Sequence, residues 1–561
     1  MGEFTLEMKR TTAIRVAIIA GVFSLVVGAI MFVNYGRRLS IEPGMEKQLE
    51  DMKNVFRDHA DNQKLADEIR QLDLEIRHGR MRWLAFSGKG AVLLLCGLGL
   101  FIGFLKYAGS AGGVKPVVEG DTVDGVAQER RGVLSRRFVW GGFGVLLVLG
   151  VLIGFRTSVE YVAEDTWPEF LAGWPTFRGS DGSGVSKHVD VPLEFDGKSG
   201  KQILWKSPVP MDGMNSPVLW GDFVFLSGGD EEKLQVYCFD VKTGKLVWSR
   251  DVESLAPEDA EVEPMEDTGF SAPTLAVDGK RVYAIFAPGD VVAFDFSGKK
   301  VWAKNLGVPD SIYGYASSLA MYKKLLIIQY DQGADDDGLS KIYALDGFSG
   351  QPVWQVKRPV ANSWASPVVV DVEGKSQIIT CSAPFVISYD AETGAELWRV
   401  ECMSGDIAPS SVYAGGLVFA LEPYNALTAI KPDGRGDVTK SHVAWKNEEA
   451  DVPDICSPVS DGELLFMLTT EGFLSCVDVK SGKIVWEKDL DEIFQASPSI
   501  VGGKLVMMSE KGIFFIVEPG REYKEISRSE LGEHCFASPA FADGRIYIRG
   551  KKNLYCIGKK D

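Results

Sequence analysis

A short phrase of small residues recurs eight times between residues 215 and 540 and restricts the folds open to this chain. The phrases begin about 40 to 56 residues apart, and each precedes two β-rich runs separated by a Gly turn. A repeat of this period that is rich in short strands is typical of propeller blades. The phrases are NSPV (215–218), SAPT (271–274), ASSL (316–319), ASPV (365–368), APSS (408–411), CSPV (456–459), ASPS (496–499) and ASPA (537–540).

A second phrase, built from Asp, a Gly turn and Trp, closes most of the units, as in DVKTGKLVW (240–248). The Gly supplies the positive φ of a tight turn, and the Asp accepts backbone N–H bonds inside that turn. We expect each Trp ring to lie across the junction with the adjacent blade. The seventh unit carries Ile526 where a Trp is expected. The predicted blade-docking residues are Trp205, Trp248, Trp302, Trp354, Trp398, Trp445 and Trp486.

The two ends of the repeat region predict how the ring closes. The eighth unit stops after three predicted strands, whereas QILWKSPV (202–209) stands alone before the first unit. This segment fits as the missing outer strand of the eighth blade, which leaves no open edge. We therefore predict an all-β eight-bladed propeller over residues 202–561.

The N-terminal residues 1–156 contain three apolar runs, at about 13–33, 90–107 and 138–155. Each approaches the ~20 residues that a helix needs to cross the hydrocarbon core of a membrane. We predict an α-helical membrane anchor of three transmembrane helices, with residues 157–201 as a linker and lead-in segment. Residues 45–80 predict a long helix between the first two spans, either solvated or serving as a stalk that dimerises or binds a partner.

Charge divides the chain at the end of the predicted anchor. Residues 1–156 carry a net charge of +5 and residues 157–561 a net charge of −22. Nucleic-acid binding needs clustered positive charge, so an acidic propeller argues against it. Lys and Arg before the first span and between the second and third predict a cytoplasmic N-terminus. The propeller is then expected in the periplasm, anchored to a bacterial inner membrane.

The blade phrases resemble those of the pyrroloquinoline-quinone-like (PQQ-like) β-propeller repeat family, over about residues 174–560. The segment GWPTFRGSDGSGVS (173–186) resembles the opening of a bacterial branch of this family. The family includes quinoprotein alcohol dehydrogenases and the propeller lipoprotein of the outer-membrane barrel assembly machinery. The resemblance implies PQQ with Ca²⁺ and a catalytic Asp only if the chain is a dehydrogenase. No Cys–Cys pair, C-x-x-C-H sequence or matching Asp motif is present in the sequence.

Residues just before the repeated phrases are expected at the mouth of the central channel. Reading that position in each unit predicts an apolar funnel that either binds a ligand or partner or plugs the channel. The candidate binding residues are Met214, Phe270, Tyr315, Trp364, Gln495 and Phe536, with Ile407 and Ile455 at the two remaining positions.

The acidic run DQGADDDG (331–338) offers Asp331, Asp335, Asp336 and Asp337 as hard-cation ligands, or as a solvated loop. The chain has no nucleophile motif, and its five His show no metal-ligand spacing. We therefore expect no cofactor and a non-catalytic scaffold or subunit of a cell-envelope complex. Its predicted partners are the lipid bilayer and another envelope protein, bound through the propeller or the 45–80 helix. The alternatives are a PQQ-dependent oxidoreductase and a sensor that binds a carbohydrate or another small ligand.

Overall fold

The computed structural model describes residues 167–186, 191–257, 260 and 262–559, with helical residues at 12–24, 27–28, 94, 97, 99–104 and 106–108. The chain divides into two compact units, Met1–Ser158 and Val159–Asp561. The predicted helix at 45–80 and the third apolar run lie outside the described residues. Within the described residues, no helix is both long enough and apolar enough to span a membrane.

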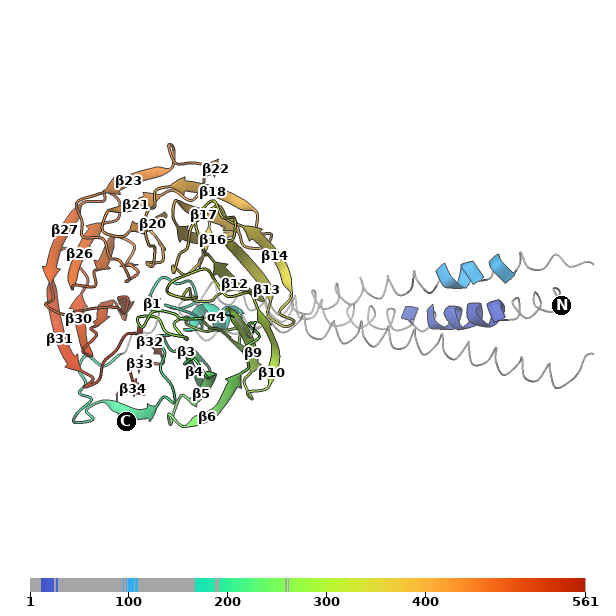
Figure 1. The fold of residues 1–561 in the computed structure, drawn as a ribbon, viewed down its shortest axis with the longest axis horizontal. Coiled ribbons are helices and arrows are strands. Elements are labelled where there is room, and N and C mark those ends of the chain that lie inside the picture. Colours follow the sequence, from blue (N-terminus) through green and yellow to red (C-terminus); the bar gives the residue numbers. More distant parts are fainter. Residues whose placement is uncertain are drawn as a thin grey trace, which may run out of the picture. The chain divides into compact units, whose positions relative to one another are not determined.

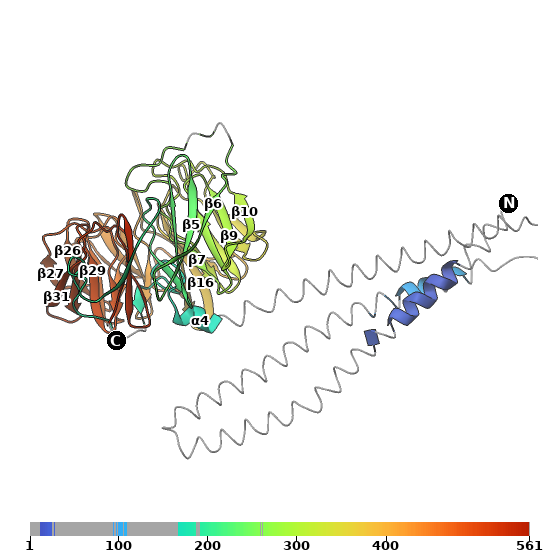
Figure 2. The same cartoon turned by 90° about the horizontal axis from the view of Figure 1, so that it is seen from below.

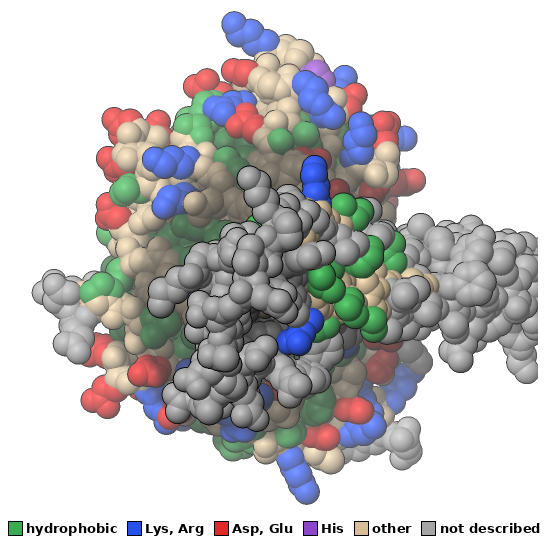
Figure 3. Space-filling view, turned by 90° about the vertical axis from the view of Figure 1, so that its right-hand side faces the viewer, with side chains coloured by type: hydrophobic (Ala, Val, Ile, Leu, Met, Phe, Trp, Pro, Cys, Tyr) green, Lys and Arg blue, Asp and Glu red, His purple; other side chains and the backbone are tan. Residues whose placement is uncertain are grey.

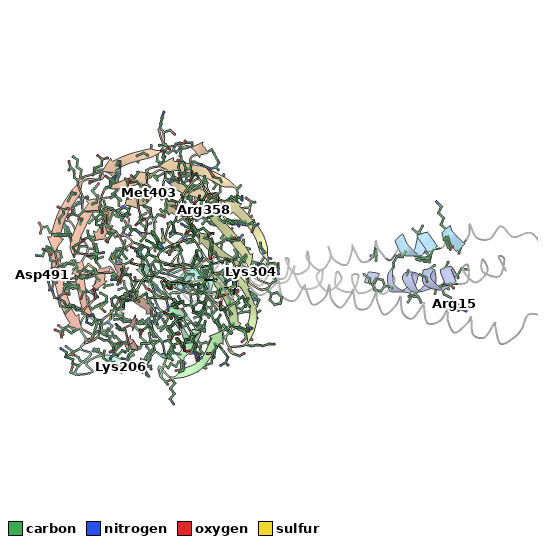
Figure 4. All side chains as sticks on the ribbon, viewed as in Figure 1. Arg15, Lys206, Lys304, Arg358, Met403 and Asp491 are labelled. Atoms are coloured by element: carbon green, nitrogen blue, oxygen red, sulfur yellow. The ribbon has the colours of Figure 1, made fainter. Side chains whose placement is uncertain are left out.

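In the N-terminal unit, the first two apolar runs contact each other through small residues. A Cβ atom placed on Gly21 would lie 3.1 Å from the ring of Phe101, and one placed on Gly97 would lie 2.3 Å from the Ser24 hydroxyl. Other large apolar side chains point outward, with Ile18 and Ile102 more than half exposed. Figure 4 labels Arg15 on the first of these helical stretches. The buried face of this stretch consists of Ala13, Ala17, Ala20 and Ser24.

The C-terminal unit is a ring of eight antiparallel sheets around a common centre, as Figure 1 shows. This confirms the predicted eight-bladed propeller. Blade 1 consists of β3 (Val218–Trp220), β4 (Phe223–Gly229), β5 (Leu234–Asp240) and β6 (Leu246–Val252). Blade 2 consists of β7 (Ala276–Val277), β8 (Arg281–Ile285), β9 (Asp290–Asp295) and β10 (Lys300–Asn305). Blade 3 consists of β11 (Ala320–Tyr322), β12 (Leu325–Tyr330), β13 (Lys341–Asp346) and β14 (Pro352–Lys357). Blade 4 consists of β15 (Val368–Val372), β16 (Lys375–Ser382), β17 (Phe385–Asp390) and β18 (Glu396–Glu401).

The second half of the ring repeats this order, with two short additions. Blade 5 consists of β19 (Val412–Ala414), β20 (Leu417–Glu422), β21 (Ala426–Ile430) and β23 (Val443–Asn447). Blade 6 consists of β24 (Val459–Ser460), β25 (Leu464–Leu468), β26 (Phe473–Asp478) and β27 (Ile484–Asp489). Blade 7 consists of β28 (Ser499–Val501), β29 (Lys504–Met508), β30 (Ile513–Glu518) and β31 (Lys524–Glu530). Blade 8 consists of β32 (Ala540–Ala542), β33 (Arg545–Arg549), β34 (Asn553–Ile557) and β2 (Ile203–Pro208). The additions are β22 (Gly436–Asp437), parallel to β18, and β1 (Val185–Ser186), parallel to β28.

The ring closes through the strand that the sequence places before the first unit. Strand β2 pairs antiparallel with β34, with Trp205 opposite Cys556. Gly558 N–H also donates to Gln202 O at 3.0 Å. The eighth blade therefore combines segments from both ends of the propeller sequence, and β2 supplies the outer strand that β34 would otherwise lack, as predicted.

Five of the seven closing Trp side chains, those of Trp205, Trp248, Trp302, Trp354 and Trp445, lie against the turn glycine of the following blade. A Cβ atom placed on Gly482 would lie 2.5 Å from Cε3 of Trp445, so this turn must have no side chain. Trp445 Nε1 donates to Val479 O in the same turn, at 3.1 Å. The same bond recurs from Trp205 to Val241 O, Trp248 to Phe296 O, Trp302 to Gly347 O and Trp486 to Gly520 O. Trp354 likewise lies against Gly394.

The strand position opposite each Trp is occupied by a small residue. Cys238 pairs with Trp248, Ala344 with Trp354 and Cys556 with Trp205. The small side chain leaves room for the indole ring, and the outer strand has a bulge at the residue just before the Trp in each case. Several of the cysteines therefore fill a packing position.

Trp398 faces a longer turn, that of blade 5, and does not donate to a carbonyl of that turn. The indole nitrogen of Trp354 also lacks the bond, since it has no hydrogen-bond partner among the described residues. The inserted strand β22 pairs with Trp398 through Gly436, and the Trp398 indole is fully buried. Its Nε1 donates to Gln377 Oε1 at 3.0 Å, and Gln377 Nε2 donates onward to Pro432 O at 3.2 Å. The Gln377 amide thus replaces the direct bond between blades.

In blade 7, the assignment of Ile526 to the Trp position is wrong by one residue. The bulge in β31 places Ser527 opposite Ile516 and leaves Ile526 unpaired and exposed. Residues 193–197 run along this strand in place of an indole ring. Phe195 packs on Phe514 with ring centroids 5.5 Å apart, and the Ser527 hydroxyl donates to Leu193 O.

The two faces of the propeller differ. Helix α4 (Trp167–Ala172) lies at one face, and the loop between β6 and β7 rises from the opposite face, as Figure 2 shows. Acidic and basic side chains are interspersed around the periphery in the view of Figure 3. The central channel between the two faces is where the repeated phrases meet.

Candidate functional site

Hydrogen bonds link the eight repeated phrases one after another around the channel. In seven of the eight phrases, the backbone N–H of the Ser or Thr donates to the Ser or Thr hydroxyl of the next blade, at 2.9–3.0 Å. Seven such bonds link the eight blades in one direction. We call these residues the hydroxyl ring: Ser216, Thr274, Ser318, Ser366, Ser410, Ser457, Ser497 and Ser538. The Ser of the phrase therefore aligns adjacent blades, a role that its sequence pattern did not reveal.

Residues 174–186, which we call the channel segment, cross the central channel. Their backbone carbonyls accept hydrogen bonds from three blades: Leu219 N donates to Trp174 O, Val277 N to Pro175 O and Ile500 N to Gly184 O, at 2.9 Å each. The side chain of Arg178 reaches a fourth blade, where Nη2 donates to Pro458 O at 2.6 Å. The segment that resembles the family's opening thus belongs to the propeller core.

Arg178 anchors the channel segment. Its guanidinium is buried and donates mainly to main-chain carbonyls, including Pro458 O and Pro498 O. Burial lowers the pKa of Arg178 to about 10, so the side chain remains charged at neutral pH. A Cβ atom on Gly184 would lie 2.5 Å from its Nη2, which excludes a side chain there.

A cavity of about 680 Å³ occupies the channel beside this segment. Phe177 of the channel segment lines it together with all eight residues of the hydroxyl ring. The volume lies within the range of ~300–1,000 Å³ typical of ligand pockets. The cavity therefore has a polar wall of hydroxyls and an aromatic contribution from the channel segment.

The structure places four of the six predicted funnel residues on this cavity, namely Met214, Trp364, Gln495 and Phe536, along with Ile455. Phe270 packs instead against the core between blades 1 and 2. Tyr315 is buried and stacks on Tyr330, with ring centroids 5.0 Å apart. Ile407 is fully buried in the core of blades 4 and 5. Whether the residues on the cavity bind a ligand stays a prediction.

Sequence reasoning missed several polar and aromatic residues on the cavity. Tyr313 and Tyr424 contribute rings, and Asp267, Asp406 and Asp454 contribute carboxylates. Asp406 and Asp454 lie two residues before their phrases, so reading one position earlier would have found both. Asp267 and Tyr424 lie in loops that carry no repeat signal.

The charge of the cavity bears on the PQQ alternative. Its described lining contains three Asp and no Lys, Arg or His. PQQ is a tricarboxylate, and carboxylates in proteins are held by basic side chains or backbone N–H groups. The residues present therefore do not fit the quinone.

The acidic run at 331–338 is divided by the structure. Asp331 is buried, and its Oδ1 lies 2.8 Å from Arg358 Nε, whereas Asp335, Asp336 and Asp337 are exposed. Arg358 lies inside the ring of blades in Figure 4. Burial raises the pKa of Asp331 to about 6 although Arg358 acts in the opposite direction. No group of three or more His, Cys, Asp or Glu among the described residues is arranged to hold a metal ion.

The seven described cysteines are free thiols. Burial raises the pKa of each, for example to about 11 for Cys381 and about 12 for Cys238. Because the thiolate is the reactive form, these residues are poor nucleophiles at neutral pH. Their environment favours a packing role.

Fold and cavity together define an eight-bladed PQQ-like propeller with a segment of its own chain across the channel. A sequence profile of the family described as outer membrane protein assembly factor BamB matches residues 184–314, 339–453 and 436–519. The chain belongs to this family. BamB of Burkholderia pseudomallei (strain K96243) is 24% identical over 342 residues, which span 54% of this chain and 83% of that protein.

Two solved structures are similar to this chain at low sequence identity. BamB from Moraxella catarrhalis is 14% identical with a TM-score of 0.47, covering 63% of this chain and 99% of that chain. Quinohemoprotein alcohol dehydrogenase from Comamonas testosteroni is 12% identical with a TM-score of 0.53, covering 70% of this chain and 82% of that chain. The likeness to the dehydrogenase concerns the fold alone.

Proposed function

We propose that this chain is an inner-membrane protein whose propeller acts in the periplasm as a non-catalytic docking subunit of a cell-envelope complex. The proposal is carried by one observation: exposed apolar side chains surround the mouth of the central cavity. Tyr424 is 73% exposed and Ile312 67% exposed, in loops that also line the cavity or adjoin residues that do. Exposed apolar residues gathered at one site are typical of a surface that contacts a partner.

The packing of the first two apolar runs supports the membrane anchor. Gly, Ala and Ser on their contacting faces allow close approach, as where the Phe101 ring packs on Gly21, and other large apolar side chains such as Ile18 and Ile102 point outward. Helices in a bilayer associate in this way, because small residues allow close approach and lipid surrounds the apolar exterior. The asymmetry of Lys and Arg then favours a cytoplasmic N-terminus and a periplasmic propeller.

Family membership supports the role in an envelope complex, since the matched family is described as an outer membrane assembly factor. The cavity lining gives no support to quinone chemistry. A sensor of a small ligand or carbohydrate is the second candidate, and the cavity volume of about 680 Å³ favours it.

Site-specific photo-crosslinking in intact cells tests the docking function. A photoreactive amino acid replaces Tyr424 at the cavity mouth, and in a matched control it replaces Phe348, which is also exposed but lies in the turn between β13 and β14. We expect a discrete adduct with one envelope protein from position 424 only. Equal adducts from both positions, or none from position 424, would contradict the proposal. Labelling of a Cys introduced at exposed position 336 by a membrane-impermeant reagent tests the periplasmic location.

A further inference from the structure

Three features of the central cavity determine which occupant it can take. Two favour a positive charge, and the third favours an apolar segment. The first is the charge of the cavity: Asp267, Asp406 and Asp454 reach it from the loops before β7, β19 and β24. No basic side chain in the described lining neutralises them. Covering carboxylates without a cation raises their free energy, so an occupant that shields them from water needs a positive charge.

The second feature is the aromatic wall. Tyr313 and Trp364 meet edge to face with ring centroids 4.8 Å apart, and Trp364 Nε1 donates to Ser311 Oγ at 3.3 Å. The Tyr424 hydroxyl donates to Asp454 Oδ2 at 2.7 Å, and this bond to a carboxylate raises the pKa of Tyr424 to about 12. Faces of Trp and Tyr attract cations, and this attraction adds to that of the carboxylates.

The third feature is the apolar rim. Met265 and Ile312 adjoin the lining residues of their loops, and Tyr424 and Ile455 are themselves part of the lining; all four are exposed. A free amine would leave these side chains in water. A polypeptide would cover them with its own apolar residues while the alkyl stem of a long basic side chain passes between them.

From this geometry we propose that the cavity receives a Lys or Arg side chain presented by an apolar segment of a partner polypeptide. The proposal rests on the docking function above and specifies the chemistry of the partner. The net charge of −22 on residues 157–561 favours the approach of such a segment over long distances.

Peptide binding to the detergent-solubilised full chain provides the test. The probe is a fluorescently labelled, acetylated and amidated peptide, Ala-Leu-Leu-Arg-Leu-Ala, compared with the same peptide carrying citrulline in place of Arg. Citrulline keeps the shape and removes the charge. We expect the Arg peptide to bind at least ~10-fold more tightly by fluorescence anisotropy, with the difference shrinking at high salt.

The double variant Asp406→Asn/Asp454→Asn should abolish the preference for Arg, so that the Arg and citrulline peptides bind with the same affinity. The matched control is Asp335→Asn/Asp336→Asn, which removes the same charge from an exposed loop and should retain the preference. Equal binding of the two peptides, or an unchanged preference in the Asp406/Asp454 variant, would overturn the inference. Methylguanidinium that competes as strongly as the Arg peptide would overturn the role of the apolar segment.

The crosslinking experiment separates this inference from the docking function. An adduct at position 424 that persists in the Asp406→Asn/Asp454→Asn variant would leave the docking function in place and refute the basic segment. Loss of the adduct in that variant, together with its retention in the Asp335→Asn/Asp336→Asn control, is the result we expect.

Discussion

Arg549 in the last blade donates a hydrogen bond of 2.6 Å from Nη1 to Asn215 Oδ1 in the first blade. The same nitrogen donates to Ser227 O at 2.7 Å, and Nη2 donates to Met211 O at 3.2 Å. Asn215 Nδ2 in turn donates to Ser271 O in blade 2 at 2.8 Å. A buried side chain therefore joins the end of the ring to its beginning.

Replacing Arg549 by Met should weaken ring closure. The variant leaves buried oxygen atoms of Ser227 and Met211 without this donor, which costs about 2–4 kcal/mol of unfolding free energy. Urea denaturation measures the loss, and limited proteolysis near β2 should become faster. The control Arg528→Met removes a partly exposed ion pair with Glu525 and should cost less than about 1 kcal/mol. Similar losses in the two variants would contradict the closure role.

Gly482→Ala tests the contact between a closing Trp and the following blade. The new Cβ would lie 2.5 Å from Trp445, at a φ of +70°, so we expect a loss of about 2–4 kcal/mol. Gly503→Ala shares the strain, with a φ of +67°, but has no atom within 4 Å of the new Cβ. The difference between their thermal midpoints isolates the indole contact. If the two variants melt together, the indole does not restrict this turn.

Ser457→Ala tests the hydroxyl ring. It removes the acceptor of Ser410 N–H, so we expect a loss of about 1–2 kcal/mol in denaturant unfolding. Ser457→Thr keeps the oxygen, and the ring already contains Thr at position 274. The Thr variant should therefore remain close to wild type, and a Thr variant as unstable as the Ala variant would refute the bond as the cause.

Asp331→Asn tests the ion pair inside the ring. It leaves the buried Arg358 without its counter-ion, which costs about 3–5 kcal/mol. The double variant Asp331→Asn/Arg358→Met should recover part of this stability, because no charge is then buried alone. Asp336→Asn, in the exposed part of the same acidic run, should change the unfolding free energy by less than about 0.5 kcal/mol. Equal effects of Asp331→Asn and Asp336→Asn in denaturant unfolding would contradict this account.

Arg521→Gln tests a pH-dependent contact between blades 6 and 7. The Arg521 guanidinium, 2.5 Å from Asp478, together with Ser481 lowers the pKa of that carboxyl from 3.8 to about 2. A lowered pKa stabilises the fold above pH 3.8, and this contribution is lost as the pH falls through about 2. The stability advantage of wild type over the variant should therefore be constant above pH 3.8 and decline below it. An advantage that grows on acidification would refute the pairing.

The sequence predicted the blades and their closure because both depend on local repetition. The Gly–Trp spacing and the orphan strand at 202–209 reflect contacts that recur at every junction. The position of Ser527 could not be read in this way, since a bulge shifts the outer strand by one residue. The position of Tyr315 was also missed, because its ring turns toward Tyr330 and away from the channel.

The candidate site was predicted only where it follows the repeat. Trp364 and Phe536 lie on the cavity because their blades keep the common geometry. Asp267 and Tyr424 come from loops with individual shapes, and Phe177 comes from outside the repeats. Asp331 is paired by Arg358, which lies in a later part of the same blade unit, so no local pattern separates it from the exposed acidic residues beside it.

The hydrogen bond between Gly558 and Gln202 means that the propeller has no physical first blade. A circular permutant that joins these two residues by a short linker and opens the chain at the exposed turn of Gly503 should assemble the same ring. Only the stretch before Gln202, which contains the channel segment and residues 193–197, would need a new covalent connection. Its attachment, rather than the order of the blades along the gene, is then the feature that gives this ring a fixed starting point.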